Sequence, residues 1–500
     1  MRWADAGPAQ WRSVEWAAEE LRQQLPTPQL QPPPPGCADP PSLEEVAAAV
    51  KQLRNAAAAG EDGVTARMLK AAPAAVGWMH AVISLVWETG EAPVAWKRAV
   101  LVPLYKGKGD KRDADNTRGI SLLSIAGKVY TIILAQRAAQ QLEPELLEEQ
   151  CGFRPNRGLV DAVFCLRQVM AQSEQRRLPL HMAFVDLKKA FDSVDRGALW
   201  QVLRVYGLHE HLIKLIISLH SGTQAAVRLN GTLGPWFDVT RGVRQGCVLA
   251  PLLFNVFIDF VVRQTIYQNP DCGTSFAFVR NGQWVPSTEA SSACVRRVAA
   301  LLYADYMVLM AESREGLQRF LTALDAACTS LGMTINAGKT KAMCMDWGSS
   351  QEQGVFCVAG GAIEVVESFK YLGSHVHCTG SLDTQVCMRI SSAIGAFRRM
   401  QHFWGNRRVG VCIKARVYKA CVLPALLFAA EAWPQLTASQ LHRLEVCQND
   451  YLRMILGVRR ADRHSTSTIR AACGDASIVQ QSLEGRFRWM CPILRIRVVW

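Results

Sequence analysis

Short apolar segments with strand propensity are mixed with amphipathic helical segments along most of this chain, without a regular alternation. A regular strand–helix–strand order would predict a doubly wound parallel sheet, whereas an irregular mixture predicts an α+β fold. The expected strands are 99–105, 182–187, 225–229, 301–303 and 307–311, and the expected helices are 160–171, 197–206, 251–267 and 316–331.

Composition shifts divide the chain into three expected parts: 1–41, 42–375 and 376–500. Residues 26–41 are rich in proline and are expected to be a linker, so that residues 1–25 are an appended helix or the tail of an upstream unit. Ser42 and Glu45 have the spacing of a capping box, which predicts an alanine-rich helix ending near Gly60. After about residue 376 strand signals fade, and a helical region continues to an end that we expect to be truncated.

The charge balance favours a polyanionic partner. The chain has 56 Lys and Arg against 43 Asp and Glu, a net charge of +13, which suits nucleic acid first and an anionic membrane second. No apolar run reaches the roughly 18 residues of a membrane span, so we expect no membrane insertion. The short apolar segment 76–87 predicts a buried helix.

The 16 cysteines are scattered without a Cys-x-x-Cys pair, and no signal peptide leads the sequence. This pattern predicts a reduced, intracellular protein rather than a disulfide framework. Residues His375, His377, Cys378 and Cys387 cluster loosely, but their spacing matches no zinc module.

Two acids stand at the ends of expected strands. Asp186 lies at the exit of one strand, and Asp305 lies between two apolar runs that read as a hairpin. Asp305 alone is compatible with an ordinary solvent-facing turn, whereas Asp186 lies within the strand signal itself. If both reach one sheet surface, they suit Mg²⁺, which is bound by one or two carboxylates together with water and phosphate, and the reaction to test is nucleotidyl transfer.

Other acids and glycines near these strands have simpler interpretations. Asp192 and Asp195 precede an expected helix, where acids cap exposed N–H groups. Gly242 and Gly246 flank Gln245 and allow close backbone approach before Pro251, which suits the first turn of a helix. An ordinary loop leading into a helix explains this stretch equally well.

Nine motifs in order give the chain a resemblance to reverse transcriptases of non-LTR (LINE-type) retrotransposons, from about Lys51 to Gly457. The motifs are 60–63 (GEDG), 96–110 (WKRAVLVPLYKGKGD), 118–123 (RGISLL), 150–155 (QCGFRP), 183–195 around Asp186, 240–255 around Gln245, 301–310 (LLYADYMVLM), 331–341 (LGMTINAGKTK) and 369–373 (FKYLG). The resemblance implies a right-hand polymerase fold, with fingers and an antiparallel palm sheet in 42–375 and a helical thumb in 376–500. It also implies an RNA template, a DNA primer, dNTPs and two Mg²⁺ ions, with Mn²⁺ as the alternative metal.

The resemblance also implies residue roles. Asp186 and Asp305 would be catalytic and bind the metal ions, with the Leu187 carbonyl as a further ligand. The nucleotide-binding residues would be Lys106, Arg118, Phe191, Gln245, Gly246 and Lys339. Phe191 would exclude a 2′-OH, although a core aromatic is an equally good interpretation, and Lys106 could instead be a solvated surface charge. Because such elements insert into chromosomes, the resemblance implies a nuclear location.

The C-terminal region supplies the expected primer and template contacts. Segment 389–419 has eight Arg or Lys and no Asp or Glu across 31 residues, which suits phosphate contacts along a duplex, although a charge run is often only a solvated face. The expected contacts from this segment are Arg398, Arg399, Arg407 and Arg408, and the resemblance adds Tyr371, Leu372 and Gly373 as the residues that hold the primer end.

Tyr306 departs from the family pattern, since the hairpin in that family reads Tyr/Phe-Ala-Asp-Asp and this chain has tyrosine at the second Asp. A phenol with a pKa near ~10 is uncharged at neutral pH and is a poor Mg²⁺ ligand. Glu312 is too far along the return strand to replace the missing acid. We therefore expect weak or lost polymerase activity, the alternative function being a non-catalytic nucleic-acid-binding remnant with the polymerase fold.

Overall fold

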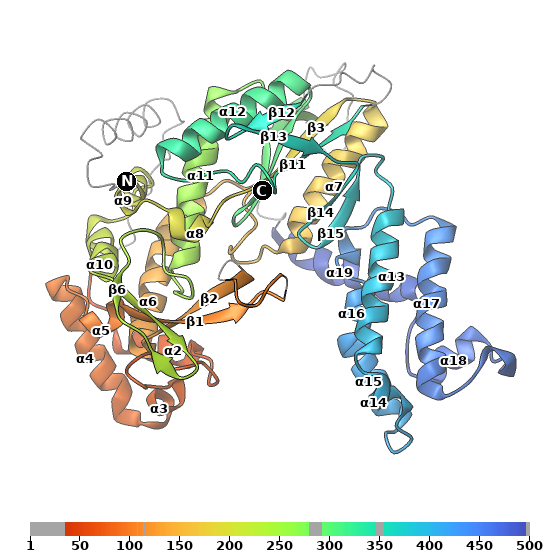
Figure 1. Ribbon diagram of the computed structural model, residues 1–500, viewed down its shortest axis with the longest axis horizontal. Coiled ribbons are helices and arrows are strands. Elements are labelled where there is room, and N and C mark those ends of the chain that lie inside the picture. The colour runs from red at the N-terminus through yellow and green to blue at the C-terminus, as the bar shows by residue number, and fades with distance from the viewer. Residues whose placement is uncertain (1–35, 108, 114–115, 280–292, 347–354, 497–500) are drawn as a thin grey trace.

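The computed structural model describes residues 36–496, apart from residue 108 and segments 114–115, 280–292 and 347–354. The expected helix or tail at 1–25 and most of the proline-rich segment therefore lie outside the described residues. The described chain forms an arch of a first lobe, a central sheet with its helices, and a helical lobe (Figure 1). The mixed α and β content agrees with the expected fold class.

The first lobe combines helices with a small sheet. Its helices are α2 (Leu43–Gln52), α3 (Ala66–Ala71), α4 (Pro73–Thr89), α5 (Val94–Lys97), α6 (Ile125–Leu142) and the 3₁₀ turn η3 (Glu143–Glu145). The sheet has the order β2-β1-β4-β5, and β6 also pairs with β4. Its strands are β1 (Arg98–Tyr105), β2 (Thr117–Leu123), β4 (Gln224–Leu229), β5 (Thr232–Leu233) and β6 (Phe237–Asp238).

The capping box of α2 is confirmed, but the helix is shorter than expected. The Ser42 hydroxyl accepts from the Glu45 amide, and the Glu45 carboxylate accepts from the Ser42 amide. The helix ends at Gln52 rather than near Gly60, because Leu53 is extended. The Lys70 ammonium then donates to the Leu53 carbonyl at 2.6 Å, satisfying a carbonyl that the ended helix leaves without a partner.

The apolar segment 76–87 predicts a buried helix, but the helix found there, α4, is buried only in part. Ile83 and Trp87 are buried, whereas Trp78 is 77% exposed and Leu85 is 59% exposed. The helix packs against α2 and α3, which cover only part of its surface. A uniformly apolar helix predicts burial all round, so the sequence does not reveal which face the neighbours leave open.

The central sheet has six strands in the order β12-β13-β11-β3-β10-β9. The strands are β3 (Leu180–Asp186), β9 (Ala300–Tyr303), β10 (Tyr306–Ala311), β11 (Lys341–Met345), β12 (Phe356–Val358) and β13 (Gly361–Val365). Neighbours are antiparallel, except that β11 and β13 are parallel. Strand β3 is therefore central, with β10 on one side and β11 on the other.

Both faces of this sheet are covered. Alternate residues of β3 such as Ala183 and Val185 face one core with α11 (Ala250–Gln268) and α12 (Arg314–Ser330). The other alternate set, Met182 and Phe184, faces a second core. Elements that contribute to this second core are α7 (Leu159–Arg176), β14 (Ser368–Tyr371) and β15 (Ser374–His377). This double burial explains why β3 is apolar on both faces.

Smaller elements follow β3 and α11 along the chain. They are α8 (Ala190–Ser193), α9 (Arg196–Val205), α10 (Glu210–His220) and the two-stranded pair β7 (Thr274–Val279) and β8 (Ala293–Val298). Asp195 caps α9, since its carboxylate accepts from the Ala198 amide at 2.9 Å. The capping role expected for Asp195 is therefore confirmed.

The helical lobe begins after β15 and has its own core, which includes Trp404, Tyr418 and Leu444. Its elements are α13 (Asp383–Arg398), α14 (Gln401–Gly405), α15 (Val411–Cys421), α16 (Leu423–Leu426), η5 (Ala430–Ala432), α17 (Ala438–Leu456), η6 (Arg460–Asp462), α18 (Thr466–Ala472) and α19 (Ile478–Ile496). The fading of strand signals after residue 376 is confirmed within the described part of this region. Among the helices that the structure describes, none combines the length and apolar character needed to cross a membrane.

Candidate functional site

The ends of β3 and of the β9–β10 hairpin bring Asp186 and Asp305 together. Tyr306 pairs directly with Asp186 across the two antiparallel strands, and Asp305 immediately precedes it in the hairpin turn. Burial raises the pKa of Asp305, and the nearby Asp186 carboxylate raises it further. The expected convergence of the two acids on one edge of the sheet is therefore found.

Cations and an amide from two other segments face these acids. The Lys339 ammonium lies 3.3 Å from Asp186 Oδ2, and Asn336 Nδ2 lies 3.5 Å from the same oxygen. Arg118, which β2 carries, and Lys339 both oppose the rise in the pKa of Asp305. The sequence analysis did not single out Asn336, although it stands three residues before Lys339 in a motif already recognised.

The segment that carries Asn336 and Lys339 is anchored to the chain just after β3. Leu187 forms an isolated antiparallel bridge with Ile335. In this bridge the Asn336 amide donates to the Asp186 carbonyl at 2.8 Å, and the Lys188 amide donates to the Thr334 carbonyl at 2.9 Å. The Leu187 carbonyl takes no part in these two bonds, which is compatible with the ligand role implied by the resemblance.

A clamp of three residues holds the hairpin tip. Gln150 Oε1 accepts from the amides of Gly152, at 2.8 Å, and Ala304, at 3.3 Å. Asn255 Nδ2 on α11 donates to the Gly152 carbonyl at 2.7 Å. A Cβ on Gly152 would lie 2.3 Å from the Ala304 nitrogen. The positions of residues 150–155 in the motif order indicated their importance, but not that they support Asp305.

The segment around Gln245 packs on the chain that follows Asp186. Gln245 Nε2 donates to both carboxylate oxygens of Asp192, at 3.1 and 3.2 Å. Asp192 lies inside α8 rather than capping a helix, so that part of the expectation is wrong: its partner comes from another loop. A Cβ on Gly242 would lie 2.7 Å from the Asp192 Cα, and one on Gly246 would lie 3.1 Å from the Ser121 carbonyl of β2.

Phe191 combines the two interpretations that its sequence context allowed. Its ring stacks on the buried Phe254, with centroids 4.5 Å apart, and meets the exposed Phe153 edge-on at 6.2 Å. The side chain is only half-buried. It is therefore fixed on the core at one side, and part of its surface is accessible near Asp192 and Gln245.

The β1–β2 hairpin carries the two other expected nucleotide contacts. Arg118 is exposed and pairs with Leu104 across the hairpin. Lys106 follows β1 directly, and its amide donates to the Asn116 carbonyl at 2.8 Å. Both cations thus lie on one exposed hairpin. Arg118 is close enough to Asp305 to lower the pKa of its carboxyl group.

Tyr371 ends β14, and Leu372 and Gly373 form the turn to β15. Tyr371 is 2% exposed, so any contact from this turn to a bound strand would come from its neighbours. Leu372 and Gly373 both have positive φ, 46° and 85°. Arg389 supports the turn by donating to the Gly373 carbonyl at 3.1 Å.

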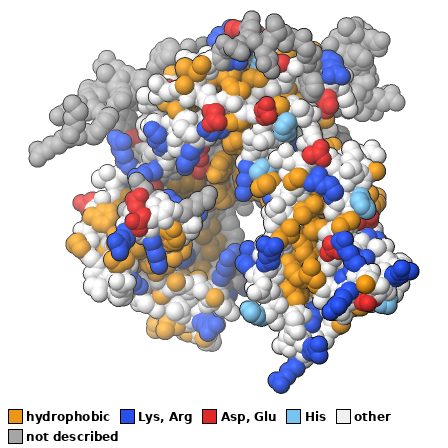
Figure 2. Space-filling view, turned by 45° about the vertical axis from the view of Figure 1, so that its right-hand side comes forward, with side chains coloured by type: hydrophobic (Ala, Val, Ile, Leu, Met, Phe, Trp, Pro, Cys, Tyr) orange, Lys and Arg blue, Asp and Glu red, His pale blue; other side chains and the backbone are white. Residues whose placement is uncertain are grey.

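The basic segment 389–419 divides into exposed and structural residues. Its exposed arginines are Arg398, Arg399, Arg407, Arg408 and Arg416. Arg389 and Lys414 are buried, as are the aromatic rings of Phe397, Trp404 and Tyr418. The interleaved aromatics therefore stabilise the helical lobe. Figure 2 shows Lys and Arg side chains beside the hollow between the lobes.

Tyr306 lies at the tip of the site with 46% of its side chain exposed. Residues paired across antiparallel strands point to the same face, so its ring lies beside the Asp186 carboxylate. Burial raises the pKa of the Tyr306 phenol, and the two acids raise it further. Glu312 accepts a hydrogen bond from the Ser275 amide at 2.9 Å, far along the return strand, as expected.

The acidic pair suits a hard divalent cation. Two carboxylates that repel one another provide the oxygen ligands that Mg²⁺ prefers, and a cation between them would relieve the repulsion that raises the pKa of Asp305. The loose cluster of His375, His377, Cys378 and Cys387 does not form a comparable donor set: His377 bonds Thr379 and Cys387 bonds Arg443.

Comparison with known proteins identifies the family. The profile described as reverse transcriptase (RNA-dependent DNA polymerase) matches residues 108–376, more than half of the chain. The chain belongs to this family. The matched residues include every side chain of the acidic site described above, from Arg118 to Lys339.

The relatives of this reverse transcriptase are proteins of non-LTR retrotransposons. It is 25% identical to the RNA-directed DNA polymerase from mobile element jockey of Drosophila funebris, over 84% of this chain and 44% of that protein. It is 27% identical to the Pol polyprotein of element R2 of Nasonia vitripennis, over 58% of this chain and 26% of that protein. The chain thus spans less than half the length of these relatives.

Asn substitution at Asp305 is expected to stabilise this reverse transcriptase when divalent metals are absent. Because the folded-state pKa of Asp305 is raised, its carboxylate opposes folding above that pKa, and the effect disappears as the pH falls through it. Asp305→Asn should raise the free energy of unfolding by roughly 0.5–1 kcal/mol at pH 7 in EDTA, and by much less near pH 3.5.

Denaturant unfolding at the two pH values checks this expectation. The exposed Asp271 provides a matched control, since Asp271→Asn removes one charge away from the site. A gain for Asp271→Asn equal to that for Asp305→Asn would show that the acids do not repel one another as inferred.

Proposed function

We propose that the chain is the RNA-directed DNA polymerase domain of a non-LTR retrotransposon and that it adds dNTPs to a primer 3′ end. The observation that carries the proposal is the convergence of Asp186 and Asp305 beside Lys339 and Arg118. Two acids facing cations from separate segments suit a polyphosphate substrate bound through metal ions.

Asp186 and Asp305, with the Leu187 carbonyl, would hold two Mg²⁺ ions, or Mn²⁺ in their place. When bound, such ions stabilise the attacking and leaving oxygens of phosphoryl transfer. Lys339 places a positive charge beside Asp186 where the leaving pyrophosphate would develop negative charge. Arg118 and Lys106, on the exposed β1–β2 hairpin, would bind the triphosphate.

The loop around Gln245 and the Phe191 ring would position the nucleotide. The hydrogen bonds from Gln245 to Asp192 join this loop to the segment after Asp186, so that one rigid wall contains both. The accessible part of Phe191 is fixed by its stacking on Phe254. A ring held in this way would leave no room for a 2′-OH and would select deoxynucleotides.

The three parts of the arch would be the fingers, palm and thumb of a right-hand polymerase. The first lobe with its β1–β2 hairpin would be the fingers, the six-stranded sheet the palm, and the helical lobe the thumb. The turn at Leu372 and Gly373 would support the primer end, and the four exposed arginines of segment 398–408 would contact the duplex of RNA template and DNA primer.

Tyr306 would impair catalysis in this chain. A protonated phenol replaces the family's second aspartate beside Asp186. Burial raises the pKa of this phenol above its ordinary value, so Tyr306 offers neither a negative charge nor a good ligand oxygen. This observation favours a second candidate function, a non-catalytic protein that keeps the fold and binds primer–template duplexes.

RNA-templated primer extension separates the two candidates. Under the first, incorporation by the chain or by its Tyr306→Asp variant requires Mg²⁺ and is abolished by Asp186→Asn. Under the second, primer–template binding persists, but no variant at position 306 gives incorporation.

Binding to primer–template duplexes is expected to depend on Arg407 and Arg408. Both side chains are exposed, and each phosphate contact contributes about 0.7–0.9 to the slope of log affinity against log salt concentration. The double change to alanine should therefore reduce this slope by about 1.5 and weaken binding roughly tenfold at low salt.

Fluorescence anisotropy at several salt concentrations measures both quantities. The control variant, Lys214→Ala with Arg319→Ala, also removes two positive charges, from exposed positions on α10 and α12. It should leave the slope nearly unchanged. Equal slopes for the two double variants would exclude the thumb contacts proposed here.

A further inference from the structure

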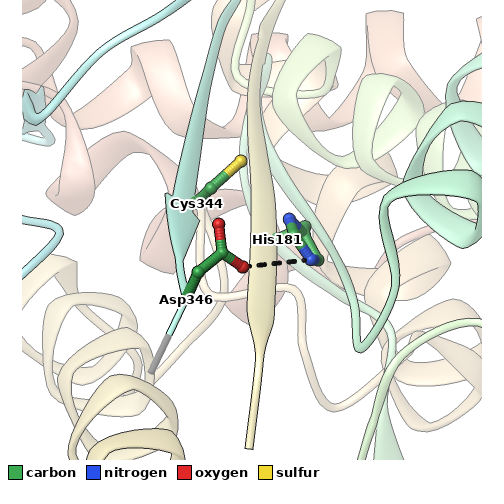
Figure 3. Close-up of side chains that lie close together, drawn as sticks. All are labelled: His181, Cys344 and Asp346. Carbon is green, nitrogen blue, oxygen red and sulfur yellow. Dashed lines mark ion pairs between the residues drawn. The ribbon is translucent and has the colours of Figure 1, made fainter. Parts of the chain in front are cut away.

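A second donor cluster lies at the end of the central sheet away from the acidic pair. His181 is near the start of β3, whereas Asp186 is at its end. Cys344 on β11 pairs directly with His181, and Asp346 follows two positions later. Opposite residues on neighbouring strands share a face, and residues two positions apart on one strand do so as well. The three side chains therefore gather on one face, as Figure 3 shows.

The donor atoms of this cluster are close enough to bind one ion. One ligand atom from each of His181, Cys344 and Asp346 lies within 4.8 Å of the other two. His181 Nε2 is 3.6 Å from Asp346 Oδ1. Zn–N and Zn–O bonds of about 2.0–2.1 Å in tetrahedral geometry require a similar separation, about 3.3 Å. Small side-chain movements would close the remaining gaps.

His181 lacks the hydrogen bonds that a buried imidazole normally makes. Its side chain is 9% exposed, and its buried Nδ1 has no hydrogen-bond partner. The 3.6 Å separation of Nε2 from Asp346 is longer than a hydrogen bond. Burial lowers the pKa of His181, which keeps the ring neutral, so this contact is not a charged ion pair. A buried ring without partners is costly unless it binds something.

We propose that His181, Cys344 and Asp346 form a binding site for a divalent transition metal of the zinc class. An imidazole, a thiolate and a carboxylate are ligands that Zn²⁺ accepts and that Mg²⁺ does not favour. Three protein ligands leave a fourth position for water, which the exposed side of Asp346 allows. The bound ion would cross-link β3 to β11 and stabilise the sheet that carries Asp186 at its other end.

Neighbouring charges are compatible with this site. Burial, followed by the Asp346 carboxylate, raises the pKa of Cys344 to about 11, and Arg314, at the start of α12, opposes this rise. Arg314 also lowers the pKa of His181, whereas Glu315 raises it. A thiolate and a carboxylate together balance the charge of a Zn²⁺ ion, and metal binding replaces the thiol proton.

Metal titration of the chelator-treated chain tests the proposal. The background is the double variant Asp186→Asn, Asp305→Asn, so that binding at the acidic pair cannot contribute. We expect one Zn²⁺ bound per chain with high affinity, and a Co²⁺ form with a thiolate charge-transfer band. Cys344→Ser should abolish the band and weaken Zn²⁺ binding at least tenfold, and Asp346→Asn should weaken it similarly.

Two controls make the test decisive. Cys378→Ser removes a neighbouring thiol that influences Cys344 but is not one of the three donors, and it should leave stoichiometry and band unchanged. Asp346→Asn changes a side chain that is 24% exposed and lies just beyond the end of β11, so its effect does not depend on repacking of the core. Absence of tight Zn²⁺ binding, or equal affinity in Cys344→Ser, Asp346→Asn and the unaltered chain, would overturn the proposal.

Discussion

Tyr306→Asp is expected to raise Mg²⁺-dependent primer extension about a thousandfold. The substitution places a carboxylate directly opposite Asp186, where a metal-bound transition state would gain both charge and a ligand oxygen. A gain of ~4 kcal/mol in transition-state stabilisation corresponds to this factor. Single-nucleotide incorporation on an RNA template, with the unaltered chain measured in parallel, gives the ratio.

Two further substitutions at position 306 separate charge from size. Tyr306→Ala removes the ring without adding a ligand, and Tyr306→Asn has nearly the shape of aspartate without its charge. We expect both to remain at least a hundredfold below Tyr306→Asp. If Tyr306→Ala were as active as Tyr306→Asp, steric obstruction would explain the impairment. If the unaltered chain extended primers as well as Tyr306→Asp, the proposed impairment would be wrong.

Tyr306→Asp, which should raise activity in Mg²⁺, should lower the stability of the chain when no metal is present. A third carboxylate beside Asp186 and Asp305 adds to the repulsion that already raises the pKa of Asp305. Thermal unfolding of Tyr306→Asp in EDTA should therefore occur at a lower temperature than that of the unaltered chain. Addition of Mg²⁺ should remove this difference in unfolding temperature. This pair of measurements checks that the new acid joins the acidic pair.

Gly152→Ala is expected to destabilise the chain by about 1–3 kcal/mol and to displace the hairpin tip. The new Cβ would lie 2.3 Å from the Ala304 nitrogen and 2.9 Å from the Tyr303 carbonyl carbon. These are backbone atoms, so the turn that carries Asp305 must move. A displacement of about 1 Å at a reacting centre can reduce a rate a hundredfold, and we expect such a loss in the Tyr306→Asp background.

Gly158→Ala provides the matched control for this substitution. Its Cβ would meet only Asp161 Oδ2, at 3.7 Å, and the backbone of Gly158 is extended, with a φ of −144°. Gly158 is the N-cap of α7, where alanine is less favourable than glycine, so we expect a loss of at most about 1 kcal/mol and no change in extension rate. Denaturant unfolding and primer extension of both alanine variants decide the matter. Similar losses in the two would show that the contact between Gly152 and the hairpin is not what positions Asp305.

The sequence by itself predicted the features that depend only on residues close to one another in the sequence. The capping box at Ser42, the cap at Asp195 and the apolar strand leading to Asp186 all follow from side chains within a few positions of each other. The order of motifs also indicated the family, because each motif is local and their succession is specific. The substitution at Tyr306 is visible in the same way.

Only the tertiary structure decided which distant residues meet. Local patterns gave Asp192 a capping role, whereas a loop far along the chain supplies its partner Gln245. They did not assign Gly152 to the hairpin tip, Asn336 to Asp186, or His181 to Cys344 and Asp346. Burial of the sheet between two cores fixes strand order and register, and register places these side chains together. That packing depends on the whole chain, so no single segment of the sequence specifies it.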